Sequence, residues 1–131
     1  MTRAPDTIGE LMTTDVVTVA PDDRVRDALR KMIDHDIGSV VVAEDGRAAG
    51  MFTERDVTRH VLTDAALLDE RVADLMSTPP ITAGPADQVV DVFDLMNGTG
   101  IRRLPVVEGE RLVGIVTEGD LRRWVGRVSR E

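Results

Sequence analysis

The chain has 131 residues, no cysteine and a formal net charge of −8. The lack of cysteine excludes disulfides, thiolate nucleophiles and sulfur-ligated zinc, and the acidic balance argues against nonspecific nucleic-acid binding, which needs Lys and Arg to neutralise phosphates. No apolar run approaches the ~18 residues of a membrane span, so we expect a cytoplasmic protein without membrane association.

The first predicted elements are a short helical turn, a short strand and an amphipathic helix. The turn covers Ile8–Met12 and the strand covers Val16–Val19. Apolar residues then recur at i, i+3, i+4, i+7 and i+8 over Val25–Ile33, which is the spacing of a helix with one buried face. Asp22 or Asp23 is the expected N-cap of this helix.

A hairpin and a second helix follow. Ser39–Ala43 and Ala48–Thr53 are rich in residues that favour strands, and the polar turn Glu44-Asp45-Gly46 separates them. This pattern predicts a β-hairpin. Directly after it, Glu54–Leu62 has its apolar residues on one side and predicts a helix.

This series of elements occurs twice. Thr53 and Thr117 are 64 residues apart, as are Asp56 and Asp120, and this offset aligns Ile8–Val61 with Val72–Val125 without a gap. Such a self-match indicates an internal duplication. The second copy predicts a turn at Val72–Met76, a strand at Ile81–Thr82, and a helix that starts from an Asp87 cap, runs through Val89 and stops at Asn97–Gly100. It also predicts strands at Arg103–Val107 and Leu112–Thr117 and a helix at Glu118–Arg127.

We therefore predict an α+β fold of two β-α-β-β-α repeats. The repeats cover residues 8–62 and 72–127, and a linker covers residues 63–71. A unit of about 60 residues buries only about 60% of its unfolded surface and is marginal alone, so we expect the halves to complete one core.

Each repeat has a Thr-x-x-Asp motif where its last strand runs into its last helix, at Thr53/Asp56 and Thr117/Asp120. The free N–H groups and the positive dipole end of a helix suit a phosphate, and threonine can add a hydroxyl donor. A carboxylate can accept hydrogen bonds from the two vicinal hydroxyls of a ribose. The same spacing is also a capping box, and the motif alone leaves both interpretations open.

The order of elements and the stretches LMTTDVVTVAPDD and IRRLPVVEGERLVGIVTEGDL resemble a tandem pair of CBS domains, or Bateman module. The resemblance extends from Ile8 to Val125 and is present in both copies. It implies pseudo-two-fold-related repeats packed through their β-sheets, with the helices outside. It also implies two clefts that bind adenine nucleotides or other adenosyl compounds, in a module that regulates another protein.

The resemblance also implies roles for individual residues. Asp56 and Asp120 are expected to hold ribose, and Thr53 and Thr117 to approach phosphate. Within this family frame, the repetition of the motif favours a ligand role in at least one copy. The adenine is expected to contact Thr18, Val19, Ala20, Ile37, Gly38 and Ser39 in repeat one, and Thr82, Ala83, Gly100, Ile101 and Arg102 in repeat two. In the alternative interpretation, the isoleucines are core residues and the glycines are turn residues.

Arginines make the two repeats unequal. The candidate ligand-binding arginines are Arg55, Arg102 and Arg103. The latter two stand where the first repeat has Gly38 and Ser39. A charge-assisted hydrogen bond to phosphate contributes about 1.5–3 kcal/mol, so the second repeat is predicted to prefer a phosphorylated ligand more strongly. For Arg122 and Arg123, pairing with surface carboxylates is the favoured interpretation.

The sequence indicates no enzyme. It has no nucleophile elbow, Walker loop or HExxH motif, and we predict no catalytic residue, no metal site and no required cofactor. His35 and His60 have no spacing typical of metal ligands.

The predicted function is that of a regulatory sensor for an adenosine-containing ligand: AMP, ADP, ATP, NAD(H) or S-adenosylmethionine. The resemblance also implies a homodimer formed through helix faces and a regulated protein partner that the sequence does not identify. Phe93 and Trp124 are candidate dimer anchors, and a core role for Trp124 is equally compatible with the sequence. The alternative function is a ligand-free dimerisation or interaction module.

Overall fold

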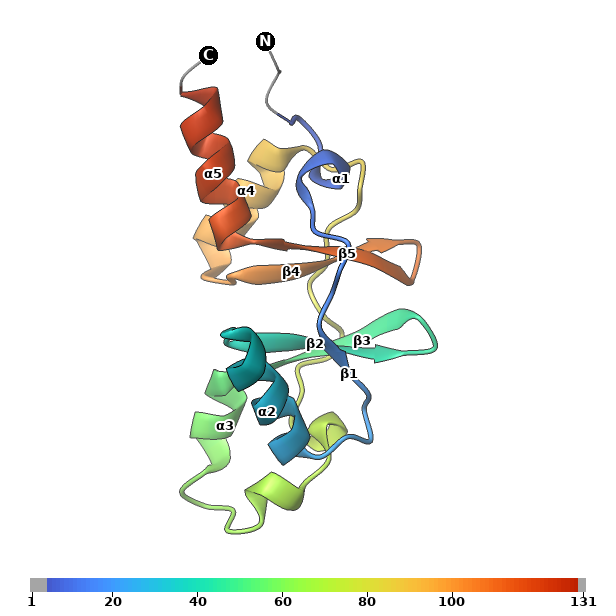
Figure 1. The fold of residues 1–131 in the computed structure, drawn as a ribbon, viewed down its shortest axis with the longest axis vertical. Helices are drawn as coiled ribbons and strands as arrows, with labels where there is room; N and C mark the ends of the chain where they lie inside the picture. The colour runs from blue at the N-terminus through green and yellow to red at the C-terminus, as the bar shows by residue number, and fades with distance from the viewer. Residues whose placement is uncertain (1–4, 130–131) are drawn as a thin grey trace. The chain divides into compact units, whose positions relative to one another are not determined.

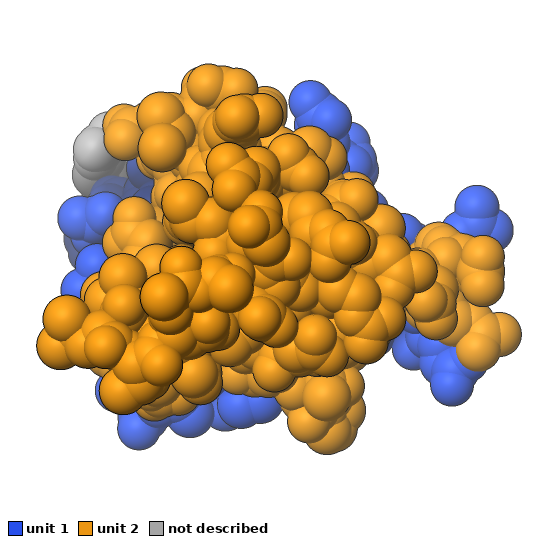
Figure 2. Space-filling view, turned by 90° about the horizontal axis from the view of Figure 1, so that it is seen from below, with its two compact units in different colours: residues 1–16, 81–131 blue, residues 17–80 orange. Residues whose placement is uncertain are grey.

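The structure is a computed structural model and describes residues 5–129. The chain divides into two compact units, which Figure 2 colours separately. Unit 2 is residues 17–80, and unit 1 combines residues up to 16 with those from 81 onward. The units therefore divide the chain differently from the sequence repeats. The first segment of each repeat belongs to the unit that contains most of the other repeat.

Unit 2 has a three-stranded arrangement covered on one face by helices (Figure 1). Its elements are β1 (Thr18–Val19), α2 (Val25–His35), β2 (Ser39–Glu44), β3 (Arg47–Thr53), α3 (Glu54–His60) and two short 3-10 helices, η1 (Leu67–Asp69) and η2 (Val72–Asp74). Strand β1 pairs with β2 in parallel, and β2 pairs with β3 in an antiparallel hairpin. Strand β1 is shorter than the predicted Val16–Val19.

Unit 1 has a similar hairpin with helices on one face, without a third strand among its described residues (Figure 1). Its elements are α1 (Ile8–Leu11), α4 (Val89–Thr99), β4 (Arg103–Glu108), β5 (Arg111–Thr117) and α5 (Glu118–Val128). Strands β4 and β5 form an antiparallel hairpin. In place of the predicted strand at Ile81–Thr82, a single parallel bridge joins Ala83 to Val106. The α+β class is thus confirmed, and so is the order of elements except for the first strand of the second repeat.

Backbone hydrogen bonds explain why the first segments exchange units. The Ile8 N–H donates to the Asp87 carbonyl at 2.9 Å, and the Val72 N–H donates to the Asp23 carbonyl at 2.8 Å. Both Ile8 and Val72 are fully buried. Each short helix therefore places an apolar side chain in a core. The backbone of α1 is held by the loop before α4, and the backbone of η2 is held by the loop before α2.

Each unit has its own core. The buried core of unit 2 is Val19, Val25, Ala28, Met32, Val40, Val42, Phe52, Leu67 and Val72. That of unit 1 is Ile8, Ala83, Val89, Val92, Met96, Leu104, Val106, Val116 and Leu121. Leu67 comes from the expected linker, so this segment contributes to packing. Phe93 and Trp124 pack against the core of unit 1, and the Trp124 indole N–H donates to the Pro5 carbonyl at 2.6 Å. These contacts favour the core interpretation of Trp124.

The predicted N-caps of the two long helices are wrong. The Asp23 carboxylate accepts from the Ala20 N–H and the Asp87 carboxylate from the Gly84 N–H, both at 2.8 Å. These aspartates close the turns that precede α2 and α4, and neither helix has a side-chain cap bond. Helix α4 ends at Thr99, within the predicted stop, and its C-cap is Gly100, whose φ of 74° favours glycine.

Candidate functional site

The Thr-x-x-Asp motif of unit 2 forms a complete capping box at the start of α3. The Thr53 N–H donates to Asp56 Oδ2 at 2.8 Å, and the Asp56 N–H donates to Thr53 Oγ1 at 3.3 Å. Asp56 is only 4% exposed. Ser39, which is also buried, pairs with Thr53 across the hairpin, so the carboxylate lies where β2, β3 and α3 meet.

Unit 1 repeats this geometry at the start of α5. The Thr117 N–H donates to Asp120 Oδ2 at 2.9 Å, and the Asp120 N–H donates to Thr117 Oγ1 at 3.1 Å. Asp120 is 5% exposed, and Arg103 pairs with Thr117 across the hairpin. The capping interpretation therefore holds in both copies, and any ligand role has to coexist with it.

The two carboxylates differ at their second oxygen. Asp120 Oδ1 accepts a hydrogen bond from Nη2 of Arg123, one turn further along α5. Asp56 Oδ1 has no hydrogen bond or ion pair among residues 5–129. Arg123 therefore pairs with a carboxylate, but its partner is the buried candidate site residue Asp120 and not a surface carboxylate as the favoured interpretation had it.

The residue four positions before each equivalent arginine also differs between the two helices. In α5 this position is Gly119, and a Cβ built on it would lie 3.6 Å from Nη1 of Arg123. In α3 the position is Arg55, four residues before Arg59. Like charges four residues apart share a helix face and repel each other. The charge of Arg55 therefore disfavours a position of the Arg59 side chain over the start of α3.

Arg103 has an unusual environment for an arginine. It is half-buried, and its Nε is buried without a hydrogen-bond partner within the described chain. Burial lowers the pKa of its guanidinium, and the nearby charge of Asp120 partly offsets this effect. A cationic side chain with a free donor beside the candidate ribose-binding residue is suited to an anion.

The approach to the hairpin also differs in charge between the units. In unit 1, Arg102 Nε lies 3.8 Å from Glu118 Oε2, and the Arg102 side chain is 83% exposed. In unit 2, a Cβ built on Gly38 would lie 3.3 Å from Glu54 Oε2. A carboxylate therefore lies beside Gly38 without the arginine that accompanies it in unit 1.

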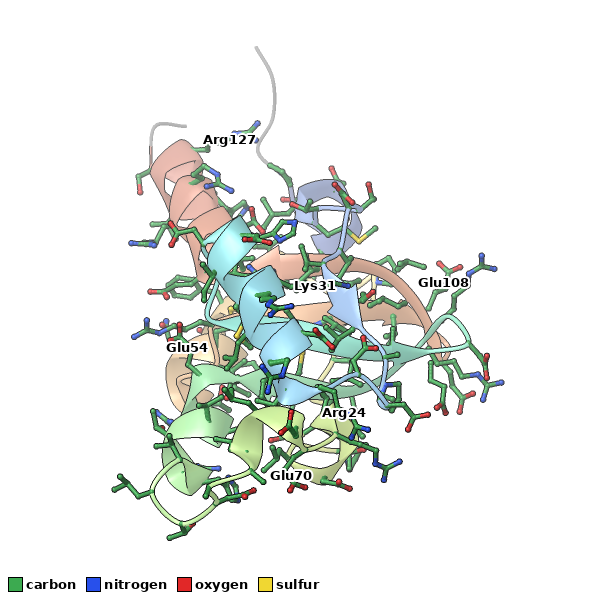
Figure 3. All side chains as sticks on the ribbon, turned by 60° about the horizontal axis from the view of Figure 1, so that its bottom comes forward. Arg24, Lys31, Glu54, Glu70, Glu108 and Arg127 are labelled. Carbon is green, nitrogen blue, oxygen red and sulfur yellow. The ribbon has the colours of Figure 1, made fainter. Side chains whose placement is uncertain are left out.

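The backbone of β1 has a contact that the sequence did not indicate. Nζ of Lys31, labelled on α2 in Figure 3, donates to the Thr18 carbonyl at 2.6 Å. Val19 and its equivalent Ala83 are buried in their cores, so only their backbone can reach a ligand. The Ala83 N–H already donates to the Pro105 carbonyl at 3.0 Å.

Within each unit, the approach to the hairpin and the Thr-x-x-Asp motif meet at the open end of the hairpin. The other predicted segments lie further along it: Thr18 and Val19 pair with Val41 and Val42 of β2, and Ala83 bridges to Val106 of β4. The Gly38 carbonyl accepts from the Glu54 N–H at 3.0 Å, and the Arg102 carbonyl accepts from the Glu118 N–H at 2.8 Å. The predicted residues Ala20, Gly38, Arg55, Gly100 and Arg102 are exposed, and Thr18, Ile37, Thr82, Ile101 and Arg103 are half-buried. Ile37 and Ile101 pack against the two cores, as the alternative interpretation proposed.

Some residues at these ends were not predicted. Four residues lie beside candidate residues: Glu54 beside Gly38, Glu118 beside Arg102, Lys31 beside Thr18 and Arg123 beside Asp120. Only Arg123 had a usable signal in the sequence, its i+3 spacing from Asp120. In the described part of the chain, no cluster of three His, Cys, Asp or Glu side chains is arranged to hold a metal ion, and no helix is long and apolar enough to cross a membrane.

The fold and the paired junctions define a tandem α+β module with two equivalent candidate binding ends. The family model described as CBS domain matches residues 8–63 and 72–127. The chain therefore belongs to the CBS-domain family.

The chain is similar to several proteins of this family. The CBS domain-containing protein YhcV of Bacillus subtilis is 36% identical over 114 residues, which cover 87% of this chain and 81% of that protein. Two longer relatives, from Methanopyrus kandleri and Arabidopsis thaliana, are matched over 60% and 56% of their lengths.

Solved structures agree with this assignment. The CBS-domain protein ATU1752 of Agrobacterium tumefaciens has a TM-score of 0.81 at 32% identity, covering 92% of this chain and 93% of that one. CBSX2, crystallised in complex with AMP, has a TM-score of 0.85 at 27% identity, covering 96% of this chain and all of that one.

Proposed function

We propose that this chain is a regulatory module that binds an adenosine-containing ligand at the ends of its hairpins, with Asp56 and Asp120 as ribose acceptors. The candidate ligands are AMP, ADP, ATP, NAD(H) and S-adenosylmethionine. The role is binding and signalling, without a catalytic step. The regulated protein partner is not identified, and we expect the module to act in the cytoplasm as a homodimer.

One observation carries this proposal: Asp56 is almost fully buried, yet capping uses only one of its carboxylate oxygens. The other oxygen, Oδ1, is not among the buried polar atoms that lack a partner in the described chain, so it can be reached from solvent. The second oxygen of Asp56 has no partner in the described chain and can accept from a ribose hydroxyl. The likeness to CBSX2, crystallised with AMP, supports the adenosine class of ligand.

Thermal unfolding with the candidate ligands tests the proposal. A ligand at a hundred times its dissociation constant adds about 2.7 kcal/mol, which raises the midpoint of a chain of this size by about 10 °C. Asp56→Ala and Asp120→Ala also remove a cap, so each ligand-induced shift must be measured against the midpoint of the same variant without ligand. Loss of the shift in one variant identifies the occupied site.

The second candidate function is a ligand-free interaction module. Two observations favour it: both motifs are complete capping boxes, and Leu62 and Ile33 are 94% and 77% exposed. This candidate predicts no shift with any ligand of the panel, and Asp→Ala losses limited to the cap contribution of about 0.5–2 kcal/mol. That result would redirect the search to a protein partner.

A further inference from the structure

The hydrogen bond between Arg123 and Asp120 Oδ1 occupies the oxygen that Asp56 leaves available in unit 2. The Asp120 side chain is 7% exposed and fixed by the cap, whereas the Arg123 side chain is 72% exposed. The carboxylate is therefore held in place, and the guanidinium is free to move into solvent.

We propose that Arg123 is a latch that closes the site of unit 1 to an uncharged nucleoside and that is released by the phosphate of a nucleotide. The inference rests on the proposed function, because it takes Asp120 as a ribose acceptor.

The argument follows from what each ligand offers to Arg123. With Oδ2 bonded to the Thr117 N–H and Oδ1 to Arg123, both oxygens of Asp120 already accept a bond. A ribose hydroxyl that takes the place of Arg123 on Oδ1 breaks a charge-assisted bond and leaves the guanidinium without an anion. A phosphate at the start of α5 supplies a new anionic partner, so Arg123 exchanges one anion for another.

Arg103 supplies a second reason for a phosphate requirement. Its buried Nε has no partner in the described chain, and the charge of Asp120 acts on it. An anion at this end of the hairpin would offset the charge of this half-buried guanidinium. The equivalent residue of unit 2 is the neutral Ser39.

Unit 2 lacks both features. Asp56 Oδ1 accepts no hydrogen bond from an arginine within the described chain. The negative charge of the Glu54 carboxylate, which lies beside Gly38, disfavours an approaching phosphate. The site of unit 2 is therefore expected to accept a nucleoside directly, whereas the site of unit 1 discriminates in favour of the nucleotide.

Calorimetric titration of the full chain with adenosine and with AMP tests the latch. An Asp56→Asn background silences unit 2, so that the heat reports unit 1 alone. Adding Arg123→Gln should tighten adenosine binding about tenfold, because no charge-assisted bond has to be broken, while AMP binding stays equal or weakens. The AMP to adenosine affinity ratio should therefore fall by about tenfold or more.

The matched control is Arg59→Gln in an Asp120→Asn background, since Arg59 is the equivalent residue of unit 2. Its affinity ratio should stay within about twofold, because Arg59 has no bond to Asp56 among residues 5–129. The guanidinium NMR signal of Arg123 gives a second readout: AMP should shift it strongly and adenosine should not.

Two failures can be told apart. If both probes bind but Arg123→Gln changes their affinities equally or not at all, Arg123 is only a structural partner of Asp120 and the latch is overturned. If the unmodified chain binds neither adenosine nor AMP nor any other ligand of the panel, the proposed function is overturned together with the latch.

Discussion

The Thr117 N–H donates to Asp120 Oδ2 at 2.9 Å, and the Asp120 N–H donates back to Thr117 Oγ1 at 3.1 Å. The residues expected to bind a ligand are therefore also those that start helix α5. A carboxylate held in this way is pre-oriented, which lowers the ordering cost of binding. It also means that a loss of stability in a variant is no evidence of a ligand role.

We expect Thr53→Ala and Thr117→Ala each to lower the free energy of unfolding by about 1 kcal/mol, because each removes the side-chain acceptor of a capping box. Urea denaturation measures this loss. The control is Thr58→Ala, since Thr58 is exposed inside α3 and alanine favours a helix interior. A loss of similar size at Thr58 would show that the effect is not capping.

Periodicity and repetition predicted most of the fold. The apolar spacing around Val25–Ile33 and the glycine-containing turn at Gly46 are local signals, and helix α2 and the first hairpin lie where they indicate. The exchange of the segments at Ile8 and Val72 has no local signal, because it depends on hydrogen bonds to residues far along the chain. Its physical cause is a long-range pairing that a helical or strand period does not encode.

The same limit applies to the site. The Thr-x-x-Asp spacing predicted both the cap and the buried carboxylate, since both are properties of a helix start. The different states of Asp56 and Asp120 coincide with a difference four residues before the equivalent arginines, where α3 has Arg55 and α5 has Gly119. That difference is visible in the sequence, but its consequence requires the side-chain positions.

Gly114 has a packing role that alanine should disturb. A Cβ on it would lie 2.6 Å from Met12 Sδ and 2.9 Å from the Thr13 carbonyl oxygen. Gly114→Ala is expected to lower the free energy of unfolding by about 1–3 kcal/mol, the usual cost of overpacking a core. Gly98→Ala is the matched control, because open space surrounds Gly98 in α4 and alanine should be neutral or stabilising. Equal losses in the two variants would contradict a steric cause.

The exposed apolar side chains of unit 2 test the proposed homodimer. Leu62 is 94% exposed and Ile33 is 77% exposed, so polar replacements should leave the unfolding midpoint of the monomer unchanged. If these residues form the dimer interface, Leu62→Ser and Ile33→Ser should increase the monomer fraction in sedimentation velocity. Ile81→Ser, which changes an exposed apolar residue of unit 1, is the control. A monomeric unmodified chain at micromolar concentration would contradict the homodimer.

Arg102 tests the predicted preference of unit 1 for phosphate without disturbing the fold. Its side chain is 83% exposed and lies 3.8 Å from Glu118, a pair too exposed to contribute much stability. Arg102→Ala should therefore keep the unfolding midpoint but weaken AMP binding by about tenfold, the value of one charge-assisted bond. Adenosine binding should change little, because the nucleoside has no phosphate for Arg102 to contact. Titration with both probes in the Asp56→Asn background decides the point, and equal losses for AMP and adenosine would rule out a phosphate contact.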